Sequence, residues 1–359
     1  MSSFKQYFLW RLKGSALRTV IFTLLSLMLI IPSVSESVEL PTWIGQHWHD
    51  VYANSSTGIE YLAILLGILC TLIPILELAG FKNRRNIDTL YFLPIRREKM
   101  AAAHFVGGFV QIIFIYTVNF LASVALIAFT SNWFDLKYMI PYYFLSLLVG
   151  LGIYSIFSFV FTQANTVSDG VLFCIAWAVI AYVVIATVQN SIIIENSPDS
   201  WRLQEWGLVY QPINSLTMIY QDLIEFRRVS AHGAQTYAIY AREHVYLFFI
   251  WGAAGIASAV GYFITFVKKG AQNAGEISDS PFGFKILIPI LSYSALILTT
   301  DSIISYALYI ALTVIAYVVY RRGFKFKKSD VICMIGTVPV AIIASIIERA
   351  VNQNFLTDY

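Results

Sequence analysis

Long apolar stretches alternate with short polar segments along most of this chain. A transmembrane helix needs about 20 mostly apolar residues. Nine segments approach that requirement: 16–34, 59–80, 102–129, 138–161, 167–188, 245–267, 285–300, 303–320 and 331–347. No cleavage pattern of small residues follows the first segment, so we expect it to be retained as a span. The pattern predicts an all-α polytopic integral membrane protein with about nine transmembrane helices.

Composition supports this class, because 58% of the residues are hydrophobic and only 13% are charged. The three cysteines fall within apolar segments and form no metal or disulfide pattern. The net charge of +3 does not indicate a nucleic-acid partner, since the cations cluster at the ends of the spans, where they meet the head groups of membrane lipid.

The segment 81–100, FKNRRNIDTLYFLPIRREKM, separates the second and third apolar stretches and is strongly basic. Its cations are Lys82, Arg84, Arg85, Arg96, Arg97 and Lys99. Short loops rich in Lys and Arg stay on the cytoplasmic side of a membrane. With this loop and the N-terminus inside, eighteen of the 24 Lys and Arg residues fall on that side. We therefore expect a multi-pass plasma-membrane protein with a cytoplasmic N-terminus.

The pattern divides the chain into three regions. Residues 1–15 place Phe4, Tyr7, Phe8 and Leu12 at helical spacing before a Gly14-Ser15 break, which predicts an interfacial elbow helix. Residues 16–267 hold six spans, the basic loop 81–100 and an outer loop at 189–244. That loop is too long for a plain connector; we expect it to fold locally, with a short amphipathic helix around 216–223, as a gate or as a cap. Residues 268–359 form a polar connector and three more spans.

Few residues in the chain indicate catalysis or ion coupling. There is no phosphate-binding loop of the form G-x-x-x-x-G-K-[ST], and the glycines in the spans are expected to serve helix packing. Glu77 and Asp169 lie close to the ends of spans and are expected to reach an interface, whereas a coupling site of a secondary transporter should lie near the midplane. We predict a non-enzymatic chain without its own cofactor or metal.

Three stretches resemble the permease subunits of ABC-2 type exporters, in the Gram-positive form with extra spans after the sixth. The first is Arg85-Asn86-Ile87-Asp88 leading to Phe92-Leu93-Pro94-Ile95-Arg96-Arg97-Glu98. The other two are the run from Lys268-Lys269 to Asn273-Ala274-Gly275-Glu276, and Arg321-Arg322-Gly323-Phe324-Lys325. The chain departs from that pattern at Gln272 and Asn273, where relatives often carry an acidic residue.

The resemblance implies that a coupling helix in Asn86–Lys99 docks on a separate cytoplasmic P-loop ATPase, which binds ATP and Mg²⁺. It also implies a second permease subunit, identical or related. The residues assigned to ATPase coupling are Asn86, Ile87, Leu90, Tyr91, Leu93, Pro94, Arg96 and Arg97. Independently of the resemblance, the segment offers an apolar face flanked by cations, as expected of a docking surface.

The function expected is that of the transmembrane subunit of an ATP-driven exporter of an amphipathic or peptide-like substrate. Two alternatives stay open: a secondary transporter, and a membrane sensor or scaffold that transports nothing.

Overall fold

The computed structural model describes residues 4–37, 50–53, 57–83, 93–130, 136–192, 227–230, 233–236, 245–270, 273–297, 303–324, 326–336 and 339. The chain forms two compact units. The first comprises Met1–Gly80, Asp88–Phe159 and Pro212–Gly270, and the second comprises Phe81–Ile87, Val160–Gln211 and Ala271–Tyr359. The fifth predicted span thus groups with the C-terminal spans, and the predicted division at residue 268 stays a prediction.

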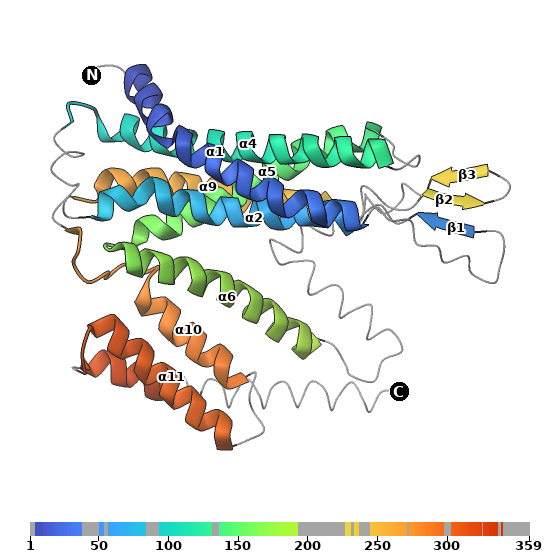
Figure 1. Ribbon diagram of the computed structural model, residues 1–359. Coiled ribbons are helices and arrows are strands. Elements are labelled where there is room, and N and C mark those ends of the chain that lie inside the picture. The colour runs from blue at the N-terminus through green and yellow to red at the C-terminus, as the bar shows by residue number, and fades with distance from the viewer. Residues whose placement is uncertain are drawn as a thin grey trace, which may run out of the picture. The chain divides into compact units, whose positions relative to one another are not determined.

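Among the described residues, the first unit has five long helices: α1 (Phe4–Ser37), α2 (Thr57–Leu78), α4 (Arg97–Thr130), most of α5 (Leu136–Gln163) and α9 (Val245–Lys268). A short 3-10 turn, η1 (Ala79–Lys82), follows α2. In Figure 1, α1 runs obliquely across α4 and α2, and it packs against both of them. Helix α4 also packs against α9.

Five helical segments among the described residues are long and apolar enough to cross a membrane. They are Phe4–Ser35, Tyr61–Lys82, Arg97–Leu126, Tyr143–Gln163 and Phe249–Lys268. This confirms a helical, membrane-embedded protein. Eight of the nine predicted spans coincide with a helix, and residues 328–336 are helical where the ninth was expected to begin. The count of nine membrane crossings stays a prediction.

Helix α1 continues through Gly14 and Ser15, so the predicted break there is wrong. Ser15 donates to the Leu12 carbonyl (3.1 Å), and Thr19 donates to the Ser15 carbonyl (3.0 Å). Both hydroxyls donate hydrogen bonds to backbone carbonyls of α1 itself. They can therefore be buried without interrupting the helix. An interfacial position for the first turns of α1 stays a prediction.

Apolar side chains from α1, α2, α4 and α5 form a continuous core in the first unit. Its members include Ile30, Leu66, Ile73, Tyr116, Ile153 and Tyr154. Helices α5 and α9 are in direct backbone contact where they cross, because a glycine of each helix lies at the crossing. A Cβ atom on Gly255 would lie 2.6 Å from the Gly152 Cα. Small residues at such crossings allow backbone contact between membrane helices.

Three short strands form a sheet that the sequence did not reveal. The strands β1 (Asp50–Ala53), β2 (Arg227–Ser230) and β3 (Gly233–Thr236) pair antiparallel in the order β1-β2-β3 (Figure 1). Asp50 pairs with Ser230, and Arg227 pairs with Thr236. The sheet joins the segment between the first two predicted spans to the long loop 189–244. The amphipathic helix expected around 216–223 lies outside the described residues.

The second unit contains α6 (Val167–Ile192), α10 (Phe284–Ile297) and α11 (Ile303–Arg321), with α10 packed against both of the others. The Phe173 and Phe284 rings meet edge to face, with their centroids 4.8 Å apart. A Cβ atom on Gly283 would lie 2.5 Å from the Phe173 ring. The missing side chain at Gly283 therefore allows α10 to begin directly against α6.

The α5–α9 crossing generates a stability prediction. Gly255→Ala places a methyl group against the backbone of Gly152, which cannot rotate away, so we expect destabilisation of about 1–3 kcal/mol. Thermal unfolding in detergent measures it. The matched control is Gly252→Ala on the same helix, where no atom lies within 4 Å of the new Cβ; it should leave the melting temperature unchanged or raise it, because alanine favours helix. Equal melting temperatures for the two variants would contradict the close crossing.

Candidate functional site

The structure describes half of the residues assigned to ATPase coupling. Leu93, Pro94, Arg96 and Arg97 are described, whereas Asn86, Ile87, Leu90 and Tyr91 lie outside the described residues. The described part forms the entry to α4 in the first unit.

Pro94 lies at the centre of a tight turn that leads into α4. The Ile95 N–H donates to the Leu93 carbonyl (2.7 Å), as in a γ-turn. The Arg96 carbonyl then accepts the Met100 N–H (3.1 Å), which closes the first helical turn. The side chains of Pro94 and Arg96 are exposed, and Leu93 is half-buried. The turn at Pro94 thus places an apolar residue, Leu93, and a cationic residue, Arg96, directly before α4.

The cations of segment 81–100 have different surroundings. Lys82, in the second unit, donates to the Ala164 carbonyl and lies 4.8 Å from the centroid of the Phe161 ring. Arg96, Arg97 and Lys99 are exposed. Arg84 and Arg85 lie outside the described residues. Arg96 lies at the positive N-terminal end of α4, where a cation is disfavoured, so helix stability does not explain its presence.

Arg97 connects the start of α4 to the end of α9. Its guanidinium donates to the Lys269 carbonyl (2.9 Å) and lies 3.4 Å from the Val267 carbonyl. Val267 lies in the last turn of α9 and Lys269 directly follows the helix, so these carbonyls lack acceptor roles within the helix. The assignment of Arg97 to ATPase coupling stays a prediction; the structure shows that its exposed side chain also makes an internal contact that joins two helices.

Glu77 forms an ionic cluster with α1 and α4. Its side chain is 1% exposed and accepts hydrogen bonds from Arg11 Nε (3.1 Å), from Arg18 and from Gln111 Nε2 (2.9 Å). His104 Nδ1 lies 3.3 Å from the same carboxylate. Glu77 is thus buried between helices near the end of α2, and the expectation that it lies at a membrane interface stays a prediction. The guanidinium groups are seven residues apart on α1, so both point to the same side of that helix.

His104 extends this cluster towards the start of α1. The Tyr7 hydroxyl lies 2.8 Å from His104 Nε2, and both side chains are buried. His104 is thus a packed histidine within the first unit. Among the described residues, no group of three His, Cys, Asp or Glu side chains could hold a metal ion.

In the second unit, the connector after α9 covers the turn between α5 and α6. Gly275 N–H donates to the Asn165 carbonyl (2.9 Å), and Asn165 N–H donates to Ser278 Oγ (2.8 Å). Ser278 Oγ in turn donates to Asp169 (2.6 Å). Asp169 was also expected to reach an interface, but it is buried in this network. Gly275 has φ 83°, a conformation that suits glycine.

The turn after α11 contains a further ion pair. Arg321 donates to both carboxylate oxygens of Asp330 at 2.8 and 2.7 Å. Asp330 also accepts the Lys327 N–H (3.0 Å), while the Lys327 carbonyl accepts the Asp330 N–H (2.9 Å). This reciprocal pair caps the helix that begins after Lys327. The hydrogen bonds from Arg321 hold the pKa of the Asp330 carboxyl below its ordinary value.

Comparison with known proteins does not assign the chain to a family: no family model matches it, and no curated protein matches it. The resemblance to ABC-2 permeases therefore rests on the stretches quoted from the sequence.

The ionic cluster generates a second prediction. Glu77→Gln leaves Arg11 and Arg18 without their carboxylate. Breaking a buried ion pair costs about 3–5 kcal/mol; we expect about 3 kcal/mol, because both arginine side chains are 25% exposed. Thermal unfolding in detergent measures the loss. Glu98→Gln, at an exposed glutamate in the first turn of α4, is the control, and an equally small effect of both variants would contradict a structural role for Glu77.

The Arg321–Asp330 pair generates a pH prediction. Because the folded-state pKa of Asp330 is lowered, its stabilisation is complete above the ordinary Asp pKa of about 4 and is lost as the pH falls through the lower value. Amide exchange at Asp330 and Val331, corrected for intrinsic rates, should show constant protection from pH 7 to 5 and falling protection below about pH 4. Asp330→Asn should show weaker protection with no such pH dependence. Identical profiles for the two proteins would refute the assignment.

Proposed function

We propose that the chain is the transmembrane permease subunit of an ATP-driven exporter. In this proposal the N-terminus and segment 81–100 are cytoplasmic in the plasma membrane, and the segment docks on a separate P-loop ATPase that binds ATP and Mg²⁺. A second permease subunit, identical or related, completes the transport path. The cargo class that fits the apolar spans is an amphipathic or peptide-like molecule.

One observation carries the proposal. The exposed residues Pro94 and Arg96 stand at the start of α4, and the next residue, Arg97, binds the last carbonyls of α9. A force applied to the turn at Pro94 would therefore act on two long helices together. The exposed residues that would dock on the ATPase and the residue that contacts α9 are neighbours in the sequence, as mechanical coupling requires.

The ionic cluster extends the same connection to α1 and α2. His104 and Gln111 of α4 contact Glu77 of α2, which binds Arg11 and Arg18 of α1. Polar contacts of this kind hold membrane helices together where hydrophobic burial does not discriminate between helix and lipid. Under the proposal, α1, α2, α4 and α9 respond as one body to ATP-driven movement of the docked subunit.

A secondary transporter is the second candidate, and the Glu77 cluster is the observation that favours it. Ionisable residues buried in spans commonly mark ion or proton routes. In this cluster, however, the carboxylate binds two arginines and a glutamine, so it is compensated internally. Substrate flux that follows an ion gradient and survives ATP depletion would favour this candidate over the exporter.

The test is affinity purification of the chain from its native membrane in mild detergent, followed by mass spectrometry. We expect a stoichiometric P-loop ATPase with the unmodified protein and its loss with Leu93→Asp combined with Arg96→Glu. Lys5→Glu reverses an exposed charge outside the segment and should retain the ATPase. Retention of the ATPase by the double variant would overturn the assignment of the docking surface.

Arg97→Ala separates docking from transmission. Because the Arg97 guanidinium contacts α9 carbonyls, we expect this variant to retain the ATPase in purification while transport per ATP hydrolysed falls. Transport and ATP hydrolysis in reconstituted vesicles measure that ratio. Loss of the ATPase itself in Arg97→Ala would instead place Arg97 in the docking surface.

A further inference from the structure

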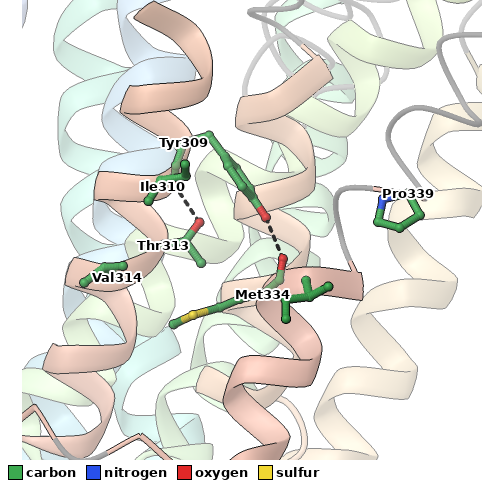
Figure 2. Close-up of a pocket in the computed structure, with 7 residues that line it drawn as sticks. Tyr309, Ile310, Thr313, Val314, Met334 and Pro339 are labelled. Atoms are coloured by element: carbon green, nitrogen blue, oxygen red, sulfur yellow. Dashed lines mark hydrogen bonds between the residues drawn. The ribbon is translucent and has the colours of Figure 1, made fainter. Parts of the chain in front are cut away.

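An apolar groove runs along α11 in the second unit. Its volume is about 400 Å³, within the range of about 300–1,000 Å³ typical of ligand pockets. Figure 2 shows Tyr309, Ile310, Thr313 and Val314 along one helix, with Met334 opposite. The four residues of α11 share one face, because their spacing matches the helical repeat.

The polar atoms in the groove are engaged in hydrogen bonds within the protein. The Tyr309 hydroxyl donates to the Met334 carbonyl (3.1 Å), and Thr313 Oγ1 donates to the Tyr309 carbonyl (2.8 Å). The Thr313 hydroxyl also contacts Ser292 Oγ (2.9 Å). The groove therefore offers hydrocarbon contacts to an occupant.

Exposed cations and aromatic rings lie in the turn at the end of α11. Arg322, Lys327 and Lys328 are exposed, and the Phe324 side chain is 81% exposed. Arg321 differs, since both of its hydrogen bonds go to Asp330. Cations beside an exposed aromatic ring are typical of a surface that contacts lipid head groups.

Arg322 occupies a backbone position that normally belongs to glycine. Its φ is 52°, and the Gly323 N–H donates to the Val318 carbonyl (3.1 Å), as in the motif that ends many helices. Glycine is the usual residue at that position, yet here glycine comes one residue later. The chain places a guanidinium where the backbone disfavours any side chain, and unusual backbone of this kind is often found at functional sites. Its guanidinium forms an ion pair with the Asp169 carboxylate (3.6 Å), and 46% of the Arg322 side chain stays exposed and accessible to a second anion.

The distance between the cations and the groove matches a phospholipid. Val314 and Ile310 precede Arg322 by eight and twelve residues, which corresponds to about 12–18 Å along a helix. Half of a bilayer's hydrocarbon core is about 15 Å thick. A lipid with its phosphate at the turn would therefore extend an acyl chain along this groove.

We propose that the α11 turn and groove bind one anionic phospholipid of the surrounding membrane. The phosphate lies on Arg322, Lys327 and Lys328, and one acyl chain lies against Ile310, Val314 and Met334. Complementary charge at one end and hydrocarbon at the other favour this occupant over a second copy of the chain. The inference goes beyond the proposed exporter function and holds independently of it.

The test uses the full chain, delipidated in detergent and titrated with phosphatidylglycerol or phosphatidylcholine, with bound lipid counted by native mass spectrometry. We expect preferential retention of phosphatidylglycerol. Arg322→Gly and Lys328→Gln should each weaken that binding about fivefold. Arg322→Gly removes the ion pair with Asp169 but relieves the positive φ, which glycine adopts freely; its melting temperature, measured alongside lipid binding, separates loss of lipid from unfolding.

A matched pair of variants tests the groove. Ile310 and Ile315 are both 58% exposed on α11, but only Ile310 lines the groove. Ile310→Trp should reduce phosphatidylglycerol binding, and Ile315→Trp should not. Equal binding of the two lipids, equal effects of the two tryptophans, displacement by free glycerol phosphate at equal concentration, or dimerisation through the groove would each overturn the proposal.

Discussion

The first unit depends on one buried carboxylate. Glu77 is 1% exposed and joins α2 to Arg11 and Arg18 of α1 and to Gln111 of α4. An isolated carboxylate in an apolar environment is very costly, and the surrounding donors offset that cost only while all three helices keep their positions. The cluster therefore fixes the register of α1, α2 and α4 more strictly than apolar packing does, because one aliphatic contact replaces another at little cost.

Other contacts of the first unit also restrict how its helices pack. The restriction is steric where α5 crosses α9, since Gly152 and Gly255 leave no space for a side chain. The restriction is polar where α4 meets α9, since the Arg97 guanidinium contacts carbonyls at the end of α9. Helices in lipid gain little from burying apolar surface against one another. Close backbone approach and directional hydrogen bonds accordingly determine which helices are neighbours, and both kinds of contact are present here.

The sequence predicted the helices well because each apolar stretch is a local signal that needs no tertiary information. It did not predict the sheet, since strands of four residues carry little periodicity and β1 pairs with β2 across more than 170 residues of chain. It placed Glu77 and Asp169 at interfaces because nearness to a span end is visible in a sequence, whereas a partner on another helix is not. The spacing of Arg11 and Arg18 opposite a carboxylate in an adjacent span was the signal available for the Glu77 cluster.

The predicted coupling residues show a related limit. The sequence treated Arg96 and Arg97 as equivalent cations. Both side chains are exposed, yet the Arg97 guanidinium also contacts carbonyls at the end of α9. The same distinction separates Arg321, which binds Asp330, from Arg322, whose backbone is in the left-handed region. In both pairs, the helix boundary falls between the two residues, so one belongs to the helix and its neighbour to the adjoining turn. A run of basic residues therefore does not define a single surface, because neighbouring cations have different surroundings.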